Sequence, residues 1–305
     1  MLDVLWQMTG LILCGVAWRQ MKPAGLDPVN TRKVLTSLVY YLLLPAMVLS
    51  VLWTVELGST TVWIALSAAG GIFAGLLLGT FACRVCSNNA PVTGAVILAS
   101  AFPNITYLGL PVLEATFGPW ARAVAIQTDV FACTPLLFTV GVIFAARFGQ
   151  ACLAPGEIYR QLLTIPAIWA AVLAVMLNLF DVPFPPIIKG WLSLLERGVV
   201  PLMLISLGLS LEWGRSRWKL LPALVPVVLL SLFILPTVVL GISTVLGLTG
   251  ELRAAVVMET AMPSMVIGLV ICDRFNLDTA LYAAAVTVTT ALSLVTLPLW
   301  HSWLI

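Results

Sequence analysis

Two strongly apolar segments of this chain each contain a proline near their middle, followed directly by polar side chains. The first reads Ala-Phe-Pro-Asn-Ile-Thr-Tyr over residues 101–107, and the second reads Glu-Thr-Ala-Met-Pro-Ser-Met over residues 259–265. A proline inside a helix removes one amide donor and clashes with the carbonyl oxygen four residues earlier. The pattern therefore predicts two helices that break at Pro103 and at Pro263.

A helix that begins inside a membrane presents unpaired amide donors and a partial positive charge. If the two breaks cross, half-helices begin near Asn104 and Ser264 and together form a site for an anion. Asn104 is the preferred contact because a buried amide is costly to leave unpaired. Alternatively, the prolines only kink their helices, and the Asn104 side chain forms hydrogen bonds with the backbone groups that the break at Pro103 leaves unpaired. The expected ligand-binding residues are Pro103, Asn104, Ile105, Thr106, Tyr107, Pro263, Ser264 and Met265.

Two carboxylic acids are predicted to lie inside apolar helices rather than at their ends. Glu259 stands one turn before Pro263, and Asp129 follows Gln127 and Thr128 about eight residues into another segment, or roughly 12 Å deep at 1.5 Å per residue. Carboxylates within a membrane are costly and usually functional. Protonated, they could couple transport to protons; ionised among oxygen ligands, they could bind Na⁺, most simply near Glu259. The sequence does not decide between proton coupling and Na⁺ binding. A third alternative is that these acids only cap a broken helix.

The composition predicts that lipid surrounds most of this chain. Of its 305 residues 61% are hydrophobic and 9% are charged, with a mean hydropathy of +1.09, whereas soluble domains carry about 25% charged residues. The net charge of +2 gives no reason to expect a nucleic-acid partner. Hydropathy predicts ten spans. They cover residues 2–18, 34–55, 62–83, 92–117, 121–146, 158–180, 187–211, 220–247, 253–275 and 279–303.

No pattern typical of an enzyme or a cofactor site is present in the sequence. It contains no HExxH, P-loop or dinucleotide fingerprint. Cys83 and Cys86 form a CxxC pair without a second pair or a neighbouring histidine, so we read them as small apolar filler. His301 lies among tryptophans at a predicted interface with the lipid headgroups. We therefore expect no enzymatic activity and no cofactor besides a coupling Na⁺ or H⁺.

The basic residues predict an orientation in the membrane. Cytoplasmic loops carry an excess of Lys and Arg, and most of the 15 basic residues fall in the odd-numbered loops. Those loops are therefore predicted to be cytoplasmic, with both termini on the other side of the membrane. The odd-loop residues are Arg19, Lys22, Arg32, Lys33, Arg84, Arg147, Arg160, Arg215, Arg217, Lys219 and Arg274; Arg122, Lys189, Arg197 and Arg253 remain on the other side.

Weak internal similarity indicates that the chain is duplicated. Residues 45–50 match residues 201–206. Residues 95–96 and 101–103 match residues 255–256 and 261–263, in the same order along each half. Because five spans is an odd number, the second half would insert upside down. We therefore predict an all-α membrane protein of two inverted five-helix repeats, 1–150 and 151–305, in which the proline-broken helices 4 and 9 cross.

Read together, these motifs resemble the auxin efflux carrier family in a short bacterial form. The resemblance is carried by Pro-Asn followed by Gly-x-Pro over residues 103–111, and by Ala-Met-Pro at 261–263 with Asp-Arg-Phe-Asn-Leu at 273–277. It implies a fold related to the bile acid:sodium symporters, with spans 1, 2, 6 and 7 as a scaffold and spans 3–5 and 8–10 as a moving bundle. It also implies organic-anion substrates, an elevator-like motion and homodimers through the scaffold. Glu259 resembles the acid that helps to bind sodium in those symporters.

These observations predict a secondary transporter in a bacterial inner membrane. Its substrates would be small organic anions, either mono- or dicarboxylates of auxin-like or malonate-like kind. Ion coupling would involve Glu259, Asp129, Thr128 and Gln127. The alternative is a membrane sensor or assembly subunit that binds a ligand without moving it.

Overall fold

The computed structural model describes residues 2–55, 57–86, 89–149, 156, 163–211 and 221–305. The regular secondary structure of these residues is helical, and the described part contains no β-strand beyond one isolated bridge. The predicted repeat boundary at 150/151 lies outside the described residues, as do Arg160, Arg215, Arg217 and Lys219 of the orientation argument.

Each of the predicted spans overlaps described helical structure. Six described helices are long and apolar enough to cross a membrane, and three shorter apolar helices accompany them. The long ones cover Pro28–Thr54, Ser59–Cys83, Ala121–Phe148, Pro186–Ser210, Pro222–Val245 and Thr279–Leu304, and the shorter ones cover Ala90–Ala101, Ile105–Phe117 and Pro166–Leu179. This arrangement agrees with a multi-pass membrane protein.

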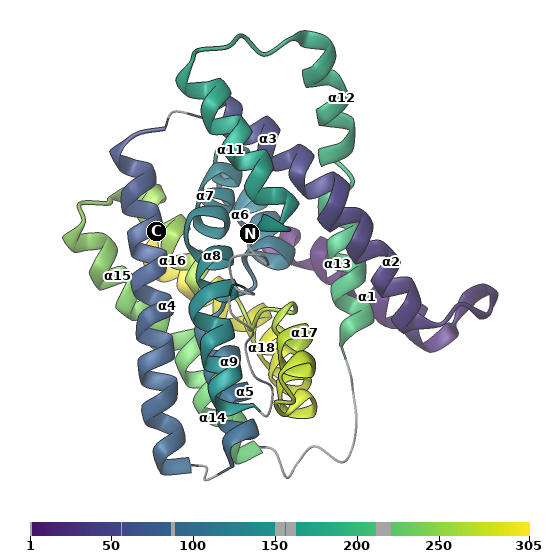
Figure 1. Cartoon of the computed structure of the whole chain (residues 1–305), viewed down its shortest axis with the longest axis vertical. Coiled ribbons are helices and arrows are strands. Elements are labelled where there is room, and N and C mark those ends of the chain that lie inside the picture. The colour runs from purple at the N-terminus through teal and green to yellow at the C-terminus, as the bar shows by residue number, and fades with distance from the viewer. Residues whose placement is uncertain (1, 56, 87–88, 150–155, 157–162, 212–220) are drawn as a thin grey trace.

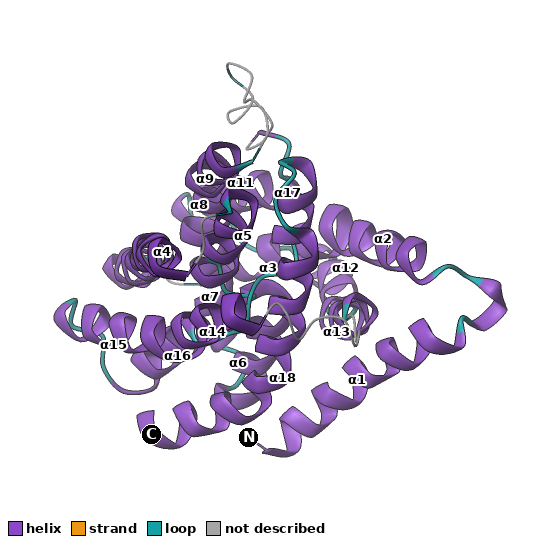
Figure 2. Ribbon diagram, turned by 90° about the horizontal axis from the view of Figure 1, so that it is seen from below, coloured by secondary structure: helices purple, strands orange, loops and turns teal. Residues whose placement is uncertain are grey.

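The helices form two groups (Figure 1), and Figure 2 shows α1, α2 and α13 apart from α4, α15 and α16. We call the first group the scaffold. In it α1 packs on α13, and both α11 and α12 pack on α3. In what we call the bundle, α4 packs on α5 and α15, and α14 packs on α18. The scaffold helices are α1 (Leu2–Met21), α2 (Pro28–Leu38), α3 (Leu44–Thr54), α11 (Pro166–Leu179), α12 (Pro186–Glu196) and α13 (Val199–Ser210). The bundle helices are α4 (Ser59–Cys86), α5 (Ala90–Ala101), α6 (Leu110–Phe117), α7 (Ala121–Thr128), α8 (Thr134–Leu136), α9 (Val142–Phe148), α14 (Leu221–Leu229), α15 (Leu235–Val245), α16 (Gly250–Thr260), α17 (Gly268–Arg274) and α18 (Thr279–Leu304).

Side-chain hydrogen bonds cap two helix ends in the scaffold, the start of α2 and the end of α3. Asp27 precedes Pro28 at the start of α2 and accepts a hydrogen bond from the Asn30 amide at 2.9 Å, which pairs one of the donors that a helix start leaves free. At the end of α3, the Asn178 amide donates to the carbonyl oxygens of Leu52, Trp53 and Val55 at 3.1, 2.9 and 2.8 Å. These bonds satisfy carbonyls that the helix end leaves open and join α11 to α3.

Short π-helical stretches interrupt several spans, and two of them bear on the site. They are η3 (Ile105–Gly109), directly after the first proline break, and η4 (Asp129–Cys133), which begins at the buried acid of the fifth span. A π-helical turn widens the helix and is frequent at functional sites. The remaining stretches are η2 (Val39–Leu43), η5 (Leu137–Gly141) and η7 (Leu230–Ile234).

Two glycines bring α1 and α13 close enough for backbone contact. A Cβ at Gly208 would clash with the Ile12 carbonyl oxygen and lie 2.9 Å from the Gly15 Cα. We expect Gly208→Ala to lower the free energy of unfolding by about 1–3 kcal/mol, the typical cost of overpacking. The measurement is the melting temperature of the protein in detergent.

Gly241→Ala is the matched control, because a Cβ at Gly241 meets nothing within 4 Å. We expect this variant to melt at the wild-type temperature or slightly above it. Equal melting temperatures for both variants would show that the α1–α13 contact is not tight.

Candidate functional site

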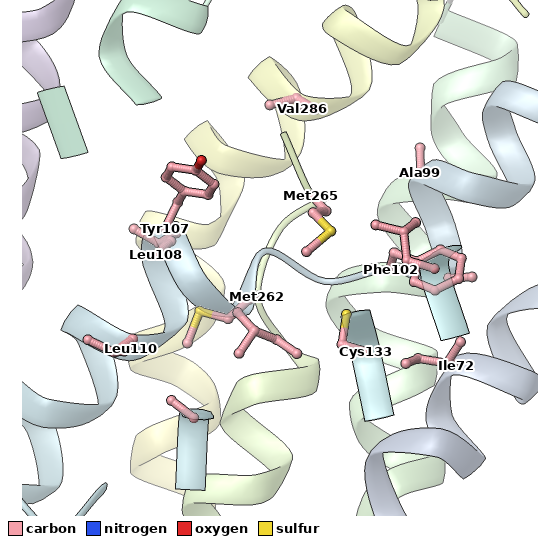
Figure 3. Packing of buried hydrophobic residues seen from close by; sticks show 14 of the residues in the cluster. Ile72, Ala99, Phe102, Tyr107, Leu108, Leu110, Cys133, Met262, Met265 and Val286 are labelled. Carbon is pink, nitrogen blue, oxygen red and sulfur yellow. The ribbon is translucent and has the colours of Figure 1, made fainter. Parts of the chain in front are cut away.

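The two proline breaks lie side by side and pair with each other. The Asn104 amide donates to the Pro263 carbonyl oxygen at 2.7 Å, and the Met265 amide donates to the Phe102 carbonyl oxygen at 3.0 Å. Pro103 and Ser264 thereby form an antiparallel bridge. Figure 3 shows Phe102, Met262 and Met265 gathered around the two extended segments. The structure therefore brings the two broken helices to one point, where each supplies backbone partners for the other.

Side chains of the bundle hold the second break in place. The Ser264 hydroxyl donates to the Ala99 carbonyl oxygen at 2.7 Å, and the Ser264 amide donates to the Thr289 hydroxyl at 3.1 Å. The Tyr282 hydroxyl donates to the Met265 carbonyl oxygen at 2.8 Å. Ser264 is fully buried. Its polar atoms thus build the crossing, so the expectation that Ser264 contacts a ligand has no support from its position.

A cavity of about 500 Å³ lies between the scaffold and the bundle. Arg32 and Lys33 of α2 and Arg274 at the end of α17 line it, and the charge distribution of the sequence predicts that these residues face the cytoplasm. Its other walls are mostly apolar, with several hydroxyl groups. They comprise Thr36, Ser37, Tyr40, Tyr41, Ser206 and Leu207 from the scaffold side, and Tyr107, Phe138, Val142, Val266, Ile267, Leu269, Val270, Ile271 and Phe275 from the bundle side.

A small pocket of about 20 Å³ leads on from this cavity to Asp129. The cavity and the pocket share Tyr40, Tyr107 and other wall residues, and Thr106, Thr134 and Met265 line the pocket alone. The Thr106 and Thr134 hydroxyls both donate to the Asp129 carboxylate, the second at 2.8 Å. Since Thr106 follows the first break, the pocket that contains Asp129 lies between the cavity wall and the crossing.

Glu259 lies in a different environment from Asp129. Its side chain is 0% exposed, and within the described structure neither carboxylate oxygen has a hydrogen-bond partner. Other buried side-chain atoms without a partner among the described residues include both amide atoms of Asn104, Oε1 of Gln127 and Oγ1 of Thr128, all on elements that pack on α16 or η3. We call these four residues the buried oxygen group.

The buried oxygen group comes from elements that pack on one another. A Cβ at Gly109 would clash with the Glu259 carboxylate, so that carboxylate lies against η3. The Asn104 carbonyl oxygen accepts the Gly109 amide at 3.0 Å. Gln127 and Thr128 end α7, which packs on both α16 and η3. Glu259 therefore lies on a helix that packs on the elements carrying the other three members.

These side chains fit a monovalent cation. An unpaired buried polar group costs about 1–3 kcal/mol, and more when charged, so a bound water or cation at the buried oxygen group would be stabilising. One carboxylate with amide and hydroxyl oxygens forms an oxygen-rich set of low total charge, which suits Na⁺. Groups of three His, Cys, Asp or Glu side chains do not occur among the described residues.

The structure divides the residues that the sequence singled out. Asn104, Gln127, Thr128 and Glu259 form the buried oxygen group, whereas Asp129 lines the small pocket together with Thr106. Tyr107 and Met265 line the pocket. Pro103, Ile105, Pro263 and Ser264 are buried at the crossing and line neither the cavity nor the pocket.

Sequence reasoning missed the contribution of the scaffold to the cavity. Tyr40 lines both the cavity and the pocket, and Thr36 lines the cavity. Thr134 completes the partners of Asp129 from the bundle. The signal for Thr134 was its place five residues after Asp129, beside a proline. Tyr40 and Tyr41 were visible as polar aromatics in an apolar segment.

An ion-pair cluster joins the bundle to the scaffold away from the cavity. The Arg122 guanidinium lies 2.5 Å from the Glu114 carboxylate and 3.3 Å from the Glu196 carboxylate. Glu114 and Arg122 belong to α6 and α7 of the bundle, and Glu196 ends α12 of the scaffold. None of the three lines the cavity. The two helix groups are thus tied together at a second place.

The sequence matches a family of membrane transport proteins over most of its length. The sequence profile of the family described as "Membrane transport protein" matches residues 10–157 and 152–301. An uncharacterized transporter of Methanothermobacter thermautotrophicus is 30% identical over 95% of this chain and 94% of its own length. One from Methanocaldococcus jannaschii is 28% identical over 70% of this chain and 68% of its own, and YfdV of Escherichia coli is 27% identical over 44% and 42%.

The contact between Gly109 and Glu259 generates a prediction. Gly109→Ala places a methyl group where the Glu259 carboxylate now lies, so the carboxylate must move out of its present position. We expect at least half of the rise in melting temperature that Na⁺ gives the wild type to disappear, because a ligand stabilises only in proportion to its occupancy.

Gly190→Ala serves as the control, since a Cβ there meets nothing within 4 Å. It should respond to Na⁺ like the wild type, with choline as the comparison cation. If Na⁺ raises the melting temperature of Gly109→Ala as much as that of the wild type, Glu259 does not contribute to a sodium site.

Proposed function

This chain belongs to the membrane transport protein family, and from that premise we propose that it is a secondary transporter of small organic anions. The observation that carries the proposal is the cavity of about 500 Å³ between scaffold and bundle, which leads through a small pocket to the crossed breaks. Ligand sites of secondary transporters form where broken helices meet near the middle of the membrane.

The lining of the cavity favours an organic anion. Arg32, Lys33 and Arg274 supply positive charge, which raises the local concentration of anions and speeds their entry. Most of the remaining wall is apolar, and Tyr40, Tyr41 and Tyr107 offer both ring surface and hydroxyl groups. A carboxylate with a small carbon skeleton combines the charge and the apolar surface that such walls accommodate.

The buried oxygen group supports coupling to a cation. Na⁺ bound between Glu259, Asn104, Gln127 and Thr128 would satisfy side chains that otherwise lack partners. Asn104 also holds the crossing through its amide and begins the turn that carries Thr106 and Tyr107. Sodium binding would therefore fix the segment that the substrate contacts, which couples the two ligands without direct contact.

Alternating access would come from movement of the bundle against the scaffold. The cavity lies at their boundary on the predicted cytoplasmic side, and the Arg122 cluster joins the same groups elsewhere. This arrangement is what an inward-open state requires. The remaining elements of the proposal are an elevator-type motion, two inverted repeats, homodimers through the scaffold, a bacterial inner membrane and termini outside the cytoplasm.

Uptake by proteoliposomes tests this function. Vesicles carrying the protein receive radiolabelled malonate or indole-3-acetate, with a Na⁺ gradient or with choline in its place. We expect Na⁺-stimulated uptake by the wild type. Glu259→Gln should fold normally but lose about tenfold or more of the stimulation, because interactions of a charged group are worth about 1.5–3 kcal/mol and each 1.4 kcal/mol is tenfold.

Glu251→Gln is the control, as Glu251 is exposed at the start of α16. It should take up the label like the wild type. Wild-type sodium dependence in Glu259→Gln would contradict the ion assignment. Anion binding without uptake by any of these proteins would instead indicate a membrane sensor.

A further inference from the structure

A groove of about 820 Å³ lies within the bundle and shares no lining residue with the cavity between scaffold and bundle. We call it the bundle groove. Residues of segment 73–83 in α4 line one side, and residues of segment 140–148 in η5 and α9 line the other. Ala90 and Thr93 of α5 line it between these two sides. The proposed anion path therefore leaves this groove unused.

Helix α5 is the common neighbour of the two sides. Both α4 and α9 pack on α5, and small residues bring each of them close to it. A Cβ at Gly79 of α4 would lie 3.3 Å from the Ile97 Cα of α5, and a Cβ at Gly94 of α5 would lie 2.9 Å from the Phe148 Cβ of α9. The groove is thus the space that α4 and α9 leave between them over α5.

The open side of the groove faces lipid. Its walls belong to two candidate membrane spans, Ser59–Cys83 and Ala121–Phe148. Phe73, Leu77 and Ile143 line it and are 50%, 71% and 49% exposed. Exposed apolar side chains on a membrane span contact hydrocarbon, so a lipid acyl chain is the occupant that can enter from this side.

The length of the groove matches one leaflet of the bilayer. Along α4 it runs from Phe73 to Cys83, which is roughly 15 Å at 1.5 Å per residue. The hydrocarbon core of a bilayer is about 30 Å thick, so one leaflet contributes about 15 Å. An acyl chain that starts at the membrane surface would therefore fill the groove along its length.

Arg147 marks the end of the groove that lies at the membrane surface. It stands exposed in the last turn of α9 and is the one charged side chain among the described residues that line the groove. The described salt bridges include none to Arg147. Asp278 approaches the start of α5 through its amide, which donates to the Pro91 carbonyl oxygen at 3.2 Å, but its carboxylate caps α18 by accepting the Leu281 amide at 2.8 Å. The charge of Arg147 is thus available to a ligand.

We propose that the bundle groove binds one acyl chain of an anionic phospholipid, whose phosphate pairs with Arg147. Arginine binds phosphate through two parallel hydrogen bonds. The charge distribution predicts that Arg147 faces the cytoplasm, where anionic head groups bind basic pockets between membrane helices. A zwitterionic lipid carries its own cation beside the phosphate and gains less from this pairing. The inference concerns a different face of the bundle from the anion path and does not rest on the proposed function.

Native mass spectrometry of the full-length protein in mild detergent tests this proposal. The probes are dioleoylphosphatidylglycerol and dioleoylphosphatidylcholine, which have the same acyl chains and differ in net charge, supplied together at equal concentration. For the wild type we expect one retained lipid, with the anionic one preferred about fivefold, the effect of one basic residue at the membrane surface. Arg147→Gln should retain the two lipids equally. Because Arg147 is exposed, this variant should fold like the wild type.

Two further variants make the result specific. Arg197→Gln removes an exposed arginine that follows α12 and lines neither the groove nor the cavity, so it should keep the wild-type preference. Thr80→Phe places a ring in the groove, and the Thr80 hydroxyl bonds only to the Leu76 carbonyl oxygen of its own helix, at 2.6 Å. This variant should lose the retained adduct of either lipid.

Several outcomes would overturn the proposal. Equal retention of both lipids by the wild type would do so, as would a preference for the anionic lipid that persists in Arg147→Gln. An unchanged lipid adduct on Thr80→Phe would place the lipid elsewhere. Conversion of a wild-type dimer to a monomer by Thr80→Phe would show that a second copy of the chain fills the groove. If Thr80→Phe does not fold, the comparison of Arg147→Gln with Arg197→Gln still decides.

Discussion

Everything in the site depends on how two broken helices satisfy their backbone inside the membrane. The lipid core offers no water to an unpaired amide or carbonyl, and each such group costs several kcal/mol there. Pro103 and Pro263 create these groups, and the two hydrogen bonds of the crossing pair them with each other. Ser264, Thr289 and Tyr282 then fix the crossing to the bundle. Each break would weaken its own helix, but here the backbone groups of the two breaks pair with each other and hold the two helices together.

The crossing also separates the two buried acids. The segment that leaves the first break turns at once into η3, whose Gly109 receives the Glu259 carboxylate, while Thr106 in the same turn donates to Asp129. One acid therefore lies among unpaired oxygens away from the cavity, and the other lies at the end of the cavity. A cation bound at Glu259 would fix η3 and thereby position Thr106 beside Asp129. This is the physical basis for coupling in our account.

Much of this could be predicted from the sequence because its strongest signals are local. Proline breaks and apolar spans follow from residues a few positions apart, so the spans and the unusual role of residues 101–107 and 259–265 were visible. Contacts between distant segments were not. The sequence could not tell that Ser264 bonds to Ala99 rather than to a ligand, that Tyr40 closes the pocket, or that Arg122 joins Glu196. Those pairings depend on packing, and hydropathy carries no information about which faces of the helices meet.

The most direct test of the central claim, that the crossing creates a cation site, is to locate the ion. Crystals of the protein soaked with Tl⁺ in place of Na⁺ would give an anomalous difference map in which a bound monovalent ion stands out. Our account predicts one peak within coordinating distance of Glu259 and Asn104, with Gln127 or Thr128 completing the site, and loss of that peak in excess Na⁺. A peak at Asp129 alone, or no peak beside Glu259 at saturating Tl⁺, would contradict it.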